Sequence, residues 1–140
     1  MSEVLLFGSP VSHSLSPAMH NAAFKALGMP HRYATREVSA EHFADAVKSL
    51  RTGDVLGANV TIPHKEAAVR LMDEASDEVR ATGALNTIVR RGSRLSADNT
   101  DVDGFEASLI SGEVELLREG TVLVLGAGGA ARACVFVRAV

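Results

Sequence analysis

Residues 4–28 have the sequence VLLFGSPVSHSLSPAMHNAAFKALG, and this stretch sets the pattern that the chain repeats. The apolar run Val4–Phe7 ends at a Gly-Ser-Pro sequence, which is typical of a buried strand that enters a loop. Ser16 then suits the N-cap of a helix with Pro17 in its first turn, and Gly28 suits the end of that helix. Strand, loop and helix in this order form the repeating unit of α/β folds.

The same alternation continues to about residue 100. We expect strands over 33–38, 55–60, 84–89 and 95–97 and helices that start at Ser39, Pro63 and Ser76. Arg91-Gly92-Ser93 separates the last two strands and predicts a hairpin. Strands and helices of these lengths predict an α/β fold with a mainly parallel sheet, helices on both faces and an antiparallel hairpin at one edge.

A second unit is expected to follow. Asp101–Ser111 predicts a helix that leads away from the sheet, and residues 113–119 form a charged passage typical of a link. Thr121–Leu125 predicts a strand, a glycine loop comes next, and 130–140 predicts a helix. The chain therefore divides into a domain over 1–100 and a linking helix with the first strand and helix of an incomplete second domain over 101–140.

Composition excludes several classes of partner. With 46% hydrophobic and 22% charged residues the chain should form a globular core, and its net charge of −3, with both signs intermixed, argues against nucleic acid or an anionic membrane surface. No apolar run approaches the roughly 20 residues of a membrane span, and the first eight residues lack the basic flank of a secretory signal. The lone Cys134 cannot form an internal disulfide, so a reducing cytoplasm is expected.

A metal site is not expected. The five histidines lack the paired spacing of a zinc site. The acidic run Asn99–Gly104 imitates the start of a calcium loop, but its twelfth position is Ile110 where a glutamate is required.

The loop after Leu125 matches the pattern G-x-G-x-x-A between a predicted strand and a predicted helix, through the residues Gly126, Ala127, Gly128, Gly129, Ala130 and Ala131. Glycine allows the tight turn and lets a diphosphate approach the backbone, where free N–H groups at the helix start bind it. The alternative is a turn in which the glycines only relieve crowding. The residue that recognises the ribose lies about 20 residues beyond the first glycines in this fold, and 14 residues follow Gly126 here.

Polar residues gather where the predicted strands end. Ser14 and Ser16 lie beside a helix start and suit a carboxylate, although for Ser16 by itself capping is the better explanation, a role that Ser14 lacks. Thr61 and Lys65 follow the strand over 55–60, at the edge where α/β sheets bind ligands. A lysine in the first turn of a helix is opposed by the helix dipole, so we expect an anionic neighbour, the alternative being a solvated side chain.

Asn86 and Asp101 complete the candidate site. An amide early in a predicted strand, as at Asn86, must find a hydrogen-bond partner. Asp101 ends a polar loop and is either a functional carboxylate or a helix cap. We expect Lys65 and Asp101 to converge on one pocket with the two early serines.

Taken together, five motifs resemble the shikimate dehydrogenase family. They are GSPVSHSLSP with HN at 8–17 and 20–21, NVTIPHK at 59–65, GALNT at 83–87, NTD with GF at 99–101 and 104–105, and GAGGAAR at 126–132. The resemblance covers essentially all of this chain and about the first half of the family's usual chain. One departure is Ala97, where the family often has glycine.

The resemblance implies an enzyme of aromatic amino acid biosynthesis that reduces 3-dehydroshikimate to shikimate with NADPH. It implies that Ser14 and Ser16 hold the substrate carboxylate, that Thr61, Asn86 and Asp101 bind ring hydroxyls, and that Lys65 and Asp101 form the catalytic pair. The residues implied to hold the NADP diphosphate are Gly126, Ala127, Gly128, Gly129, Ala130, Ala131 and Arg132. Residues 1–100 would then be the shikimate-binding catalytic domain, and 101–140 the start of a Rossmann-type NADP-binding domain.

Two alternatives stay open. The first is a non-catalytic shikimate-binding module, because the nucleotide domain is incomplete in this chain. The second is a quinate or shikimate dehydrogenase that uses NAD. We expect a truncated enzyme rather than an evolved module, and we expect apolar surface near the C-terminal end to promote self-association.

Overall fold

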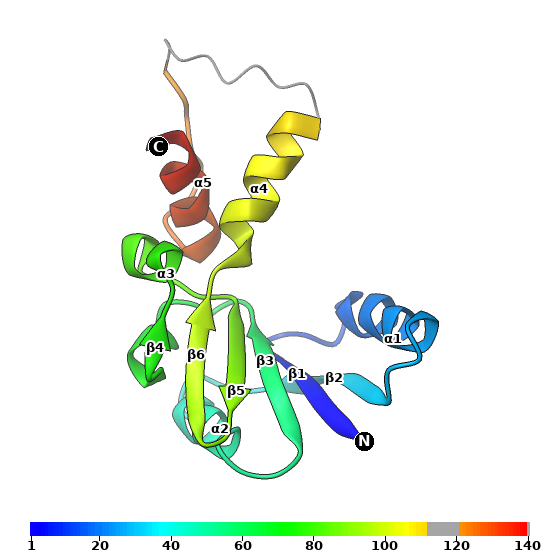
Figure 1. Cartoon of the computed structure of the whole chain (residues 1–140). Helices are drawn as coiled ribbons and strands as arrows, with labels where there is room; N and C mark the ends of the chain where they lie inside the picture. The colour runs from blue at the N-terminus through cyan, green and yellow to red at the C-terminus, as the bar shows by residue number, and fades with distance from the viewer. Residues whose placement is uncertain (112–120, 140) are drawn as a thin grey trace.

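The computed structural model describes residues 1–111 and 121–139 (Figure 1). Its elements are β1 (Ser2–Gly8), α1 (Ser16–Ala26), β2 (His31–Glu37), α2 (Phe43–Ser49), β3 (Val55–Val60), the 3-10 turn η1 (Val69–Leu71), β4 (Glu74–Ala75), α3 (Asp77–Thr82), β5 (Thr87–Arg91), β6 (Arg94–Asp98), α4 (Thr100–Ser111) and α5 (Gly129–Ala139). The α/β class predicted from the alternation of strands and helices is confirmed.

The strands form one sheet in the order β2-β1-β3-β5-β6-β4. β1 is parallel to β2 and β3, β4 is parallel to β6, and β5 is antiparallel to both of its neighbours. Among the described strands only β5 runs against the others, so the mainly parallel sheet is confirmed. The antiparallel hairpin does not form the edge, because the two-residue strand β4, too short to give a periodic pattern, pairs outside it.

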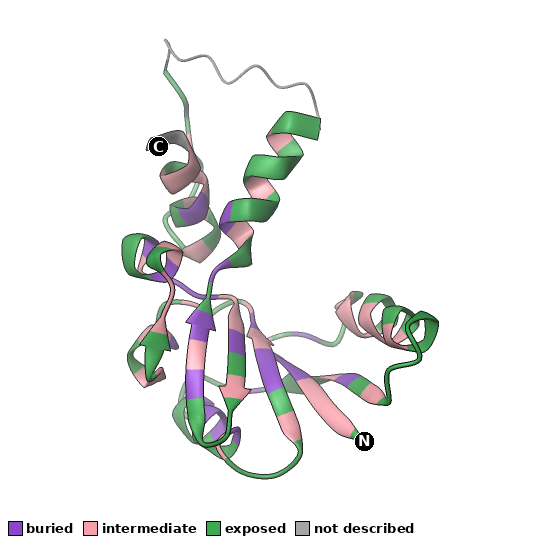
Figure 2. Ribbon diagram, in the orientation of Figure 1, coloured by how far each residue is buried: buried purple, intermediate pink, exposed green. Residues whose placement is uncertain are grey.

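Successive side chains of a strand point to opposite faces, and β1 therefore supplies both layers of the core. Leu5 and Phe7 lie in the larger cluster, which contains Phe43 of α2. Leu6 lies in the second cluster, where Phe24 of α1 packs against it. Helices thus cover both faces of the sheet, as predicted, and Figure 2 shows the most buried positions along the strands and α2.

The helix predicted from Pro63 is wrong. Residues 61–68 form turns, and only the short η1 follows. Backbone carbonyls that a helix would use internally are bonded elsewhere: Ile62 O accepts from Ser9 N–H and Lys65 O from Leu85 N–H, both at 3.0 Å. His64 is 2% exposed, and its Nε2 donates to Val38 O. Tertiary contacts therefore override the local pattern in this segment.

Two of the three predicted serine caps are also wrong. α1 has Leu15 at its N-cap, with Ser16 inside the helix, and the Ser14 hydroxyl accepts from Ser16 N–H at 3.2 Å. Ser14 thus has the structural role that the sequence did not suggest. α2 starts after His42 rather than at Ser39. The third cap is confirmed, because Ser76 accepts from the backbone of α3.

The C-terminal part is only partly as predicted. The helices α4 and α5 are confirmed, and Figure 1 shows them side by side beyond the end of the sheet where β6 leaves it. The strand predicted over Thr121–Leu125 is not formed, because a strand needs a hydrogen-bonded neighbour and the described part of the chain offers none to this segment. The link predicted over 113–119 lies outside the described residues, and the Rossmann-type unit stays a prediction.

Candidate functional site

The candidate residues lie at one edge of the sheet. The loops after β1 and β3 and the start of α4 after β6 all lie at the carboxyl ends of strands. Because β5 runs in the opposite direction, its amino end, with Asn86 just before it, reaches the same edge. The reversed strand thus brings a fourth polar segment to the place where α/β sheets bind ligands.

Lys65 and Asp101 meet at the centre of this edge. Lys65 Nζ donates to Asp101 Oδ2, and the two side chains are 15% and 30% exposed. Asp101 stands in the first turn of α4, where a carboxylate is favoured by the helix dipole. Lys65 and Asp101 thus converge as expected, but the two serines do not share a pocket with them. The anionic neighbour expected for Lys65 is present, although the reason given for it, a helix starting at Pro63, is not.

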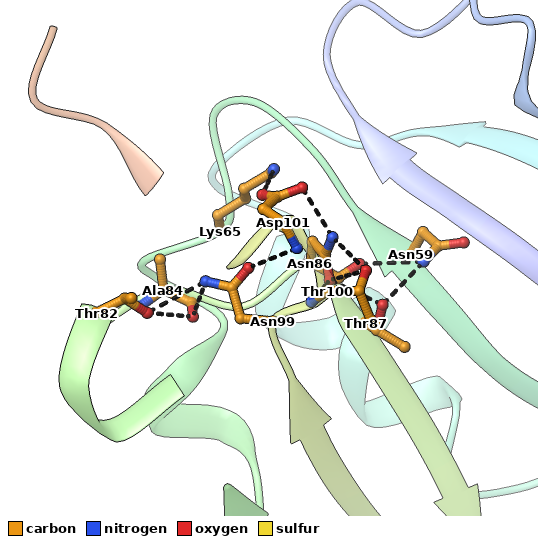
Figure 3. A network of polar contacts seen from close by, with 9 residues as sticks. All are labelled: Asn59, Lys65, Thr82, Ala84, Asn86, Thr87, Asn99, Thr100 and Asp101. Atoms are coloured by element: carbon orange, nitrogen blue, oxygen red, sulfur yellow. Dashed lines mark hydrogen bonds and ion pairs between the residues drawn. The ribbon is translucent and has the colours of Figure 1, made fainter. Parts of the chain in front are cut away.

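Asn86 binds the second carboxylate oxygen of Asp101. Its Nδ2 donates to Asp101 Oδ1 at 2.9 Å, and its Oδ1 accepts from Thr100 N–H at 3.0 Å (Figure 3). Both oxygens of Asp101 are therefore held by donors of this chain. The expected partner of the Asn86 amide is present.

Asn99 stabilises the position of Asp101, and it was assigned no role in the sequence analysis. It is 1% exposed, and its Nδ2 donates to Thr82 Oγ1 and Ala84 O, each at 3.1 Å. Its Oδ1 accepts from Asp101 N–H at 3.2 Å. Asn99 thus fixes the backbone of Asp101. Asn99 could have been identified as the first residue of the Asn-Thr-Asp motif, of which only Asp101 was used in the sequence analysis.

The two serines line a separate hollow beside the pair. A cavity of about 340 Å³ is lined by Ser14 and Ser16 together with Thr61 and Ile62. Thr61 and Ile62 also line a second cleft of about 650 Å³ that contains Lys65. The serine cavity and the Lys65 cleft therefore adjoin, with Thr61 on their shared wall.

The glycine loop forms the far wall of the Lys65 cleft. Gly126, Gly128, Gly129, Ala130 and Ala131 line it. Gly126 has φ +123°, a conformation that favours glycine, and a Cβ on Gly128 would meet no atom within 4 Å. The backbone is thus open at the amino end of α5. These residues fit a diphosphate held by backbone N–H groups.

Arg132 and Ala127 lie apart from that cleft and line a neighbouring hollow. Arg132 Nη2 forms an ion pair with Glu66 Oε2 at 2.8 Å, and its Nη1 donates to Thr82 O at 3.3 Å. The guanidinium therefore connects α5 to the loop of Lys65 and to α3, and faces protein acceptors rather than the glycine cleft.

Neither a metal centre nor a membrane-spanning helix is present within the described ranges. No group of three or more His, Cys, Asp or Glu side chains there is arranged to hold a metal ion. None of the helices over 1–111 and 121–139 has the length and apolar character needed to cross a membrane.

Comparison with known proteins identifies a family. Residues 6–88 match the family described as the shikimate dehydrogenase substrate binding domain. The shikimate dehydrogenase (NADP(+)) of Salinibacter ruber is 50% identical over 133 residues, which are 95% of this chain and 47% of the relative. The chain thus spans about half the length of the curated relatives it matches.

Solved structures give the same result. The shikimate 5-dehydrogenase of Thermus thermophilus, in complex with NADP(H) and shikimate, matches with TM-score 0.90 and 40% identity over 99% of this chain and 52% of that one. The shikimate 5-dehydrogenase of Listeria monocytogenes, in complex with shikimate and NAD, matches with TM-score 0.84 and 30% identity over 98% and 47%.

Proposed function

The chain belongs to the shikimate dehydrogenase substrate-binding domain family, and we propose that it binds shikimate and 3-dehydroshikimate for their NADP-dependent interconversion. One observation carries the proposal: Lys65 lines a cleft that adjoins the serine cavity, and it forms an ion pair with Asp101, which is far from it in sequence. An ammonium group beside a hollow lined with hydroxyls suits a small hydroxylated acid.

The substrate carboxylate is assigned to Ser14 and Ser16. Their hydroxyls line one cavity at the amino end of α1, where the helix dipole also favours an anion. Thr61, Asn86 and Asp101 are assigned to the ring hydroxyls. Thr61 adjoins the serine cavity, and the other two lie beyond it next to Lys65.

The chemistry is assigned to Lys65 and Asp101. In reduction the ketone carbon receives a hydride and its oxygen a proton, so a proton donor beside the oxygen lowers the barrier. NADPH supplies the hydride when bound. The Lys65 ammonium suits the proton donor and Asp101 orients it, and in the reverse direction the pair accepts the hydroxyl proton. The proton is assigned to the coupled pair rather than to one member.

The diphosphate of NADP is assigned to the backbone of Gly126, Gly128, Gly129, Ala130 and Ala131. Their open backbone supports the assignment, as does the NADP(H) bound by the Thermus thermophilus enzyme. We assign residues 1–100 to the substrate and residues from 101 onward to a linking helix and the beginning of the nucleotide site. Cys134 needs no oxidising compartment, so we place the protein in the cytoplasm.

Calorimetry with shikimate tests the proposal on the chain as it stands. Lys65→Ala should weaken binding by at least about ten-fold, the size expected for a lost hydrogen bond to a charged group. Lys48→Ala removes an exposed lysine from α2 and should leave affinity unchanged. Equal affinity of the Lys65 variant and the unsubstituted chain would contradict the proposal.

A turnover assay that follows NADPH separates two functions. If the chain is active, Lys65→Ala should lower kcat by at least about 100-fold, the usual scale of acid–base catalysis. An unchanged kcat with a raised KM would make Lys65 a binding residue only.

The second candidate is a shikimate-binding module without catalysis, which the match of residues 6–88 to a substrate binding domain favours. Shikimate binding without turnover or NADP binding would support it.

A further inference from the structure

The buried side chain of Tyr33 reaches the site from the edge strand β2. Tyr33 is 2% exposed and pairs with Val4, whereas Asn59 of β3 pairs with Leu6 on the other side of β1. The phenol crosses β1, and its hydroxyl donates to Asn59 Oδ1 at 2.8 Å. A residue two strands away is thereby connected to the polar edge of the sheet.

The ring is held firmly in this position. The Asn21 side chain bonds both the N–H and the carbonyl of Tyr33, at 2.8 and 2.9 Å. The His20 ring stacks on the phenol with 4.4 Å between ring centroids. Burial raises the pKa of Tyr33 to about 12, although a side-chain hydrogen bond with Ser16 lowers the pKa by a smaller amount. The hydroxyl therefore keeps its proton and acts as a donor near neutral pH.

Each link of the hydrogen-bond network beyond Tyr33 fixes the direction of the next. Asn59 Oδ1 accepts from the phenol, and its Nδ2 points the other way and donates to Thr87 Oγ1 at 3.1 Å and to Asn86 O at 3.2 Å, so Tyr33 and the Asn86 carbonyl both favour this orientation. Thr87 then donates its own proton to Asn86 Oδ1 at 2.8 Å. An amide's orientation is determined by its partners, and these partners turn the Asn86 NH2 group toward Asp101. Figure 3 shows the links from Asn59 to Asp101.

We propose that Tyr33 is a positioning residue of the Lys65–Asp101 site: its hydroxyl orients Asn59 and, through Thr87, directs the Asn86 amide group at Asp101. The reversed Asn86 amide would place an oxygen against the carboxylate, which is repulsive. The N–H and the hydroxyl of Thr100 also donate to Asn86 Oδ1, at 3.0 and 3.2 Å. The orientation of Asn86 thus rests on Thr100 as well as Thr87, and loss of the Tyr33 link should weaken the site rather than abolish it. This inference rests on the proposed function for its binding readout.

The test uses Tyr33→Phe and Thr87→Val in the full chain. Tyr33→Phe removes one oxygen and keeps the ring stacked on His20. Thr87→Val interrupts the same hydrogen-bond network at its other end with a side chain of similar shape. Each variant should weaken shikimate binding about five-fold, the effect of one neutral hydrogen bond. In the double variant the two losses of affinity should not multiply, because both substitutions act through the same hydrogen-bond network.

The side-chain NH2 signal of Asn86 in a nitrogen-15 NMR spectrum gives a readout that needs no ligand. Tyr33→Phe should move this signal although Tyr33 does not touch Asn86. An unmoved signal, or binding effects that multiply in the double variant, would overturn the inference. If the unsubstituted chain does not bind shikimate, the proposed function fails, and the NMR result alone decides the role of Tyr33.

Discussion

Replacing Gly129 by alanine should disturb Lys65 through a contact across the cleft. A Cβ atom at Gly129 would lie 3.0 Å from Lys65 Cβ, 3.1 Å from Lys65 Cδ and 3.2 Å from Ala84 Cβ. Carbon atoms in good contact are about 3.5–4.0 Å apart, so the lysine stem or α5 must move by roughly half an ångström. Overpacking of this kind costs about 1–3 kcal/mol, against a gain of up to about 1 kcal/mol from alanine in a helix.

The net cost in stability therefore lies between about zero and 3 kcal/mol, and shikimate affinity is the more specific readout for Lys65. A displaced Lys65 stem weakens its charge-assisted hydrogen bond to Asp101, and such bonds contribute about 1.5–3 kcal/mol, so affinity should fall by about ten-fold or more. Gly104→Ala is the matched control, because Gly104 lies within α4 and a Cβ there meets nothing within 4 Å. Calorimetry on both variants checks the difference. Normal affinity in Gly129→Ala would refute the argument that α5 packs on Lys65.

Two further predictions concern stability. The hydrogen bond from Arg51, with a second from Leu95 N–H, lowers the pKa of Asp73 below its ordinary 3.8, so the pair stabilises the fold at higher pH, and this contribution is lost as pH falls through the lowered pKa. We therefore expect Asp73→Asn to make the free energy of unfolding, measured in urea at several pH values, depend less on pH in the acid range. An unchanged pH dependence would show that Asp73 does not contribute to it. Arg132→Ala should raise the rate of amide hydrogen exchange in α5. Adding Glu66→Ala should raise it little further, since both substitutions remove the same ion pair. Fully additive effects would contradict a stabilising role of this ion pair.

The sheet was predictable because its signal is local. The strands β1 and β3 carry short apolar runs bounded by turn residues, and the alternation of strands with helices favours a parallel topology. The helix predicted at Pro63 failed because Ser9 and Leu85 bond its carbonyls from distant parts of the chain. The strand predicted at Thr121–Leu125 failed because an isolated run of β-forming residues has no ladder to join.

The site was predictable to the extent that sequence motifs mark strand ends. Lys65, Asn86 and Asp101 were found in this way, and the structure brings them together. Asn99 and Tyr33 were missed because their roles depend on burial and on contacts across the sheet, which no local pattern reveals. Arg132 bonds both the glycine loop, at Ala127 O, and Glu66, and its role toward the cofactor stays a prediction.

A crystal structure of this chain with shikimate tests the central claim most directly. The account predicts the carboxylate against the hydroxyls of Ser14 and Ser16, with a ring hydroxyl within hydrogen-bond distance of both Lys65 Nζ and Asp101. Shikimate bound elsewhere, or bound with its carboxylate at Lys65 and the serine cavity empty, would contradict it.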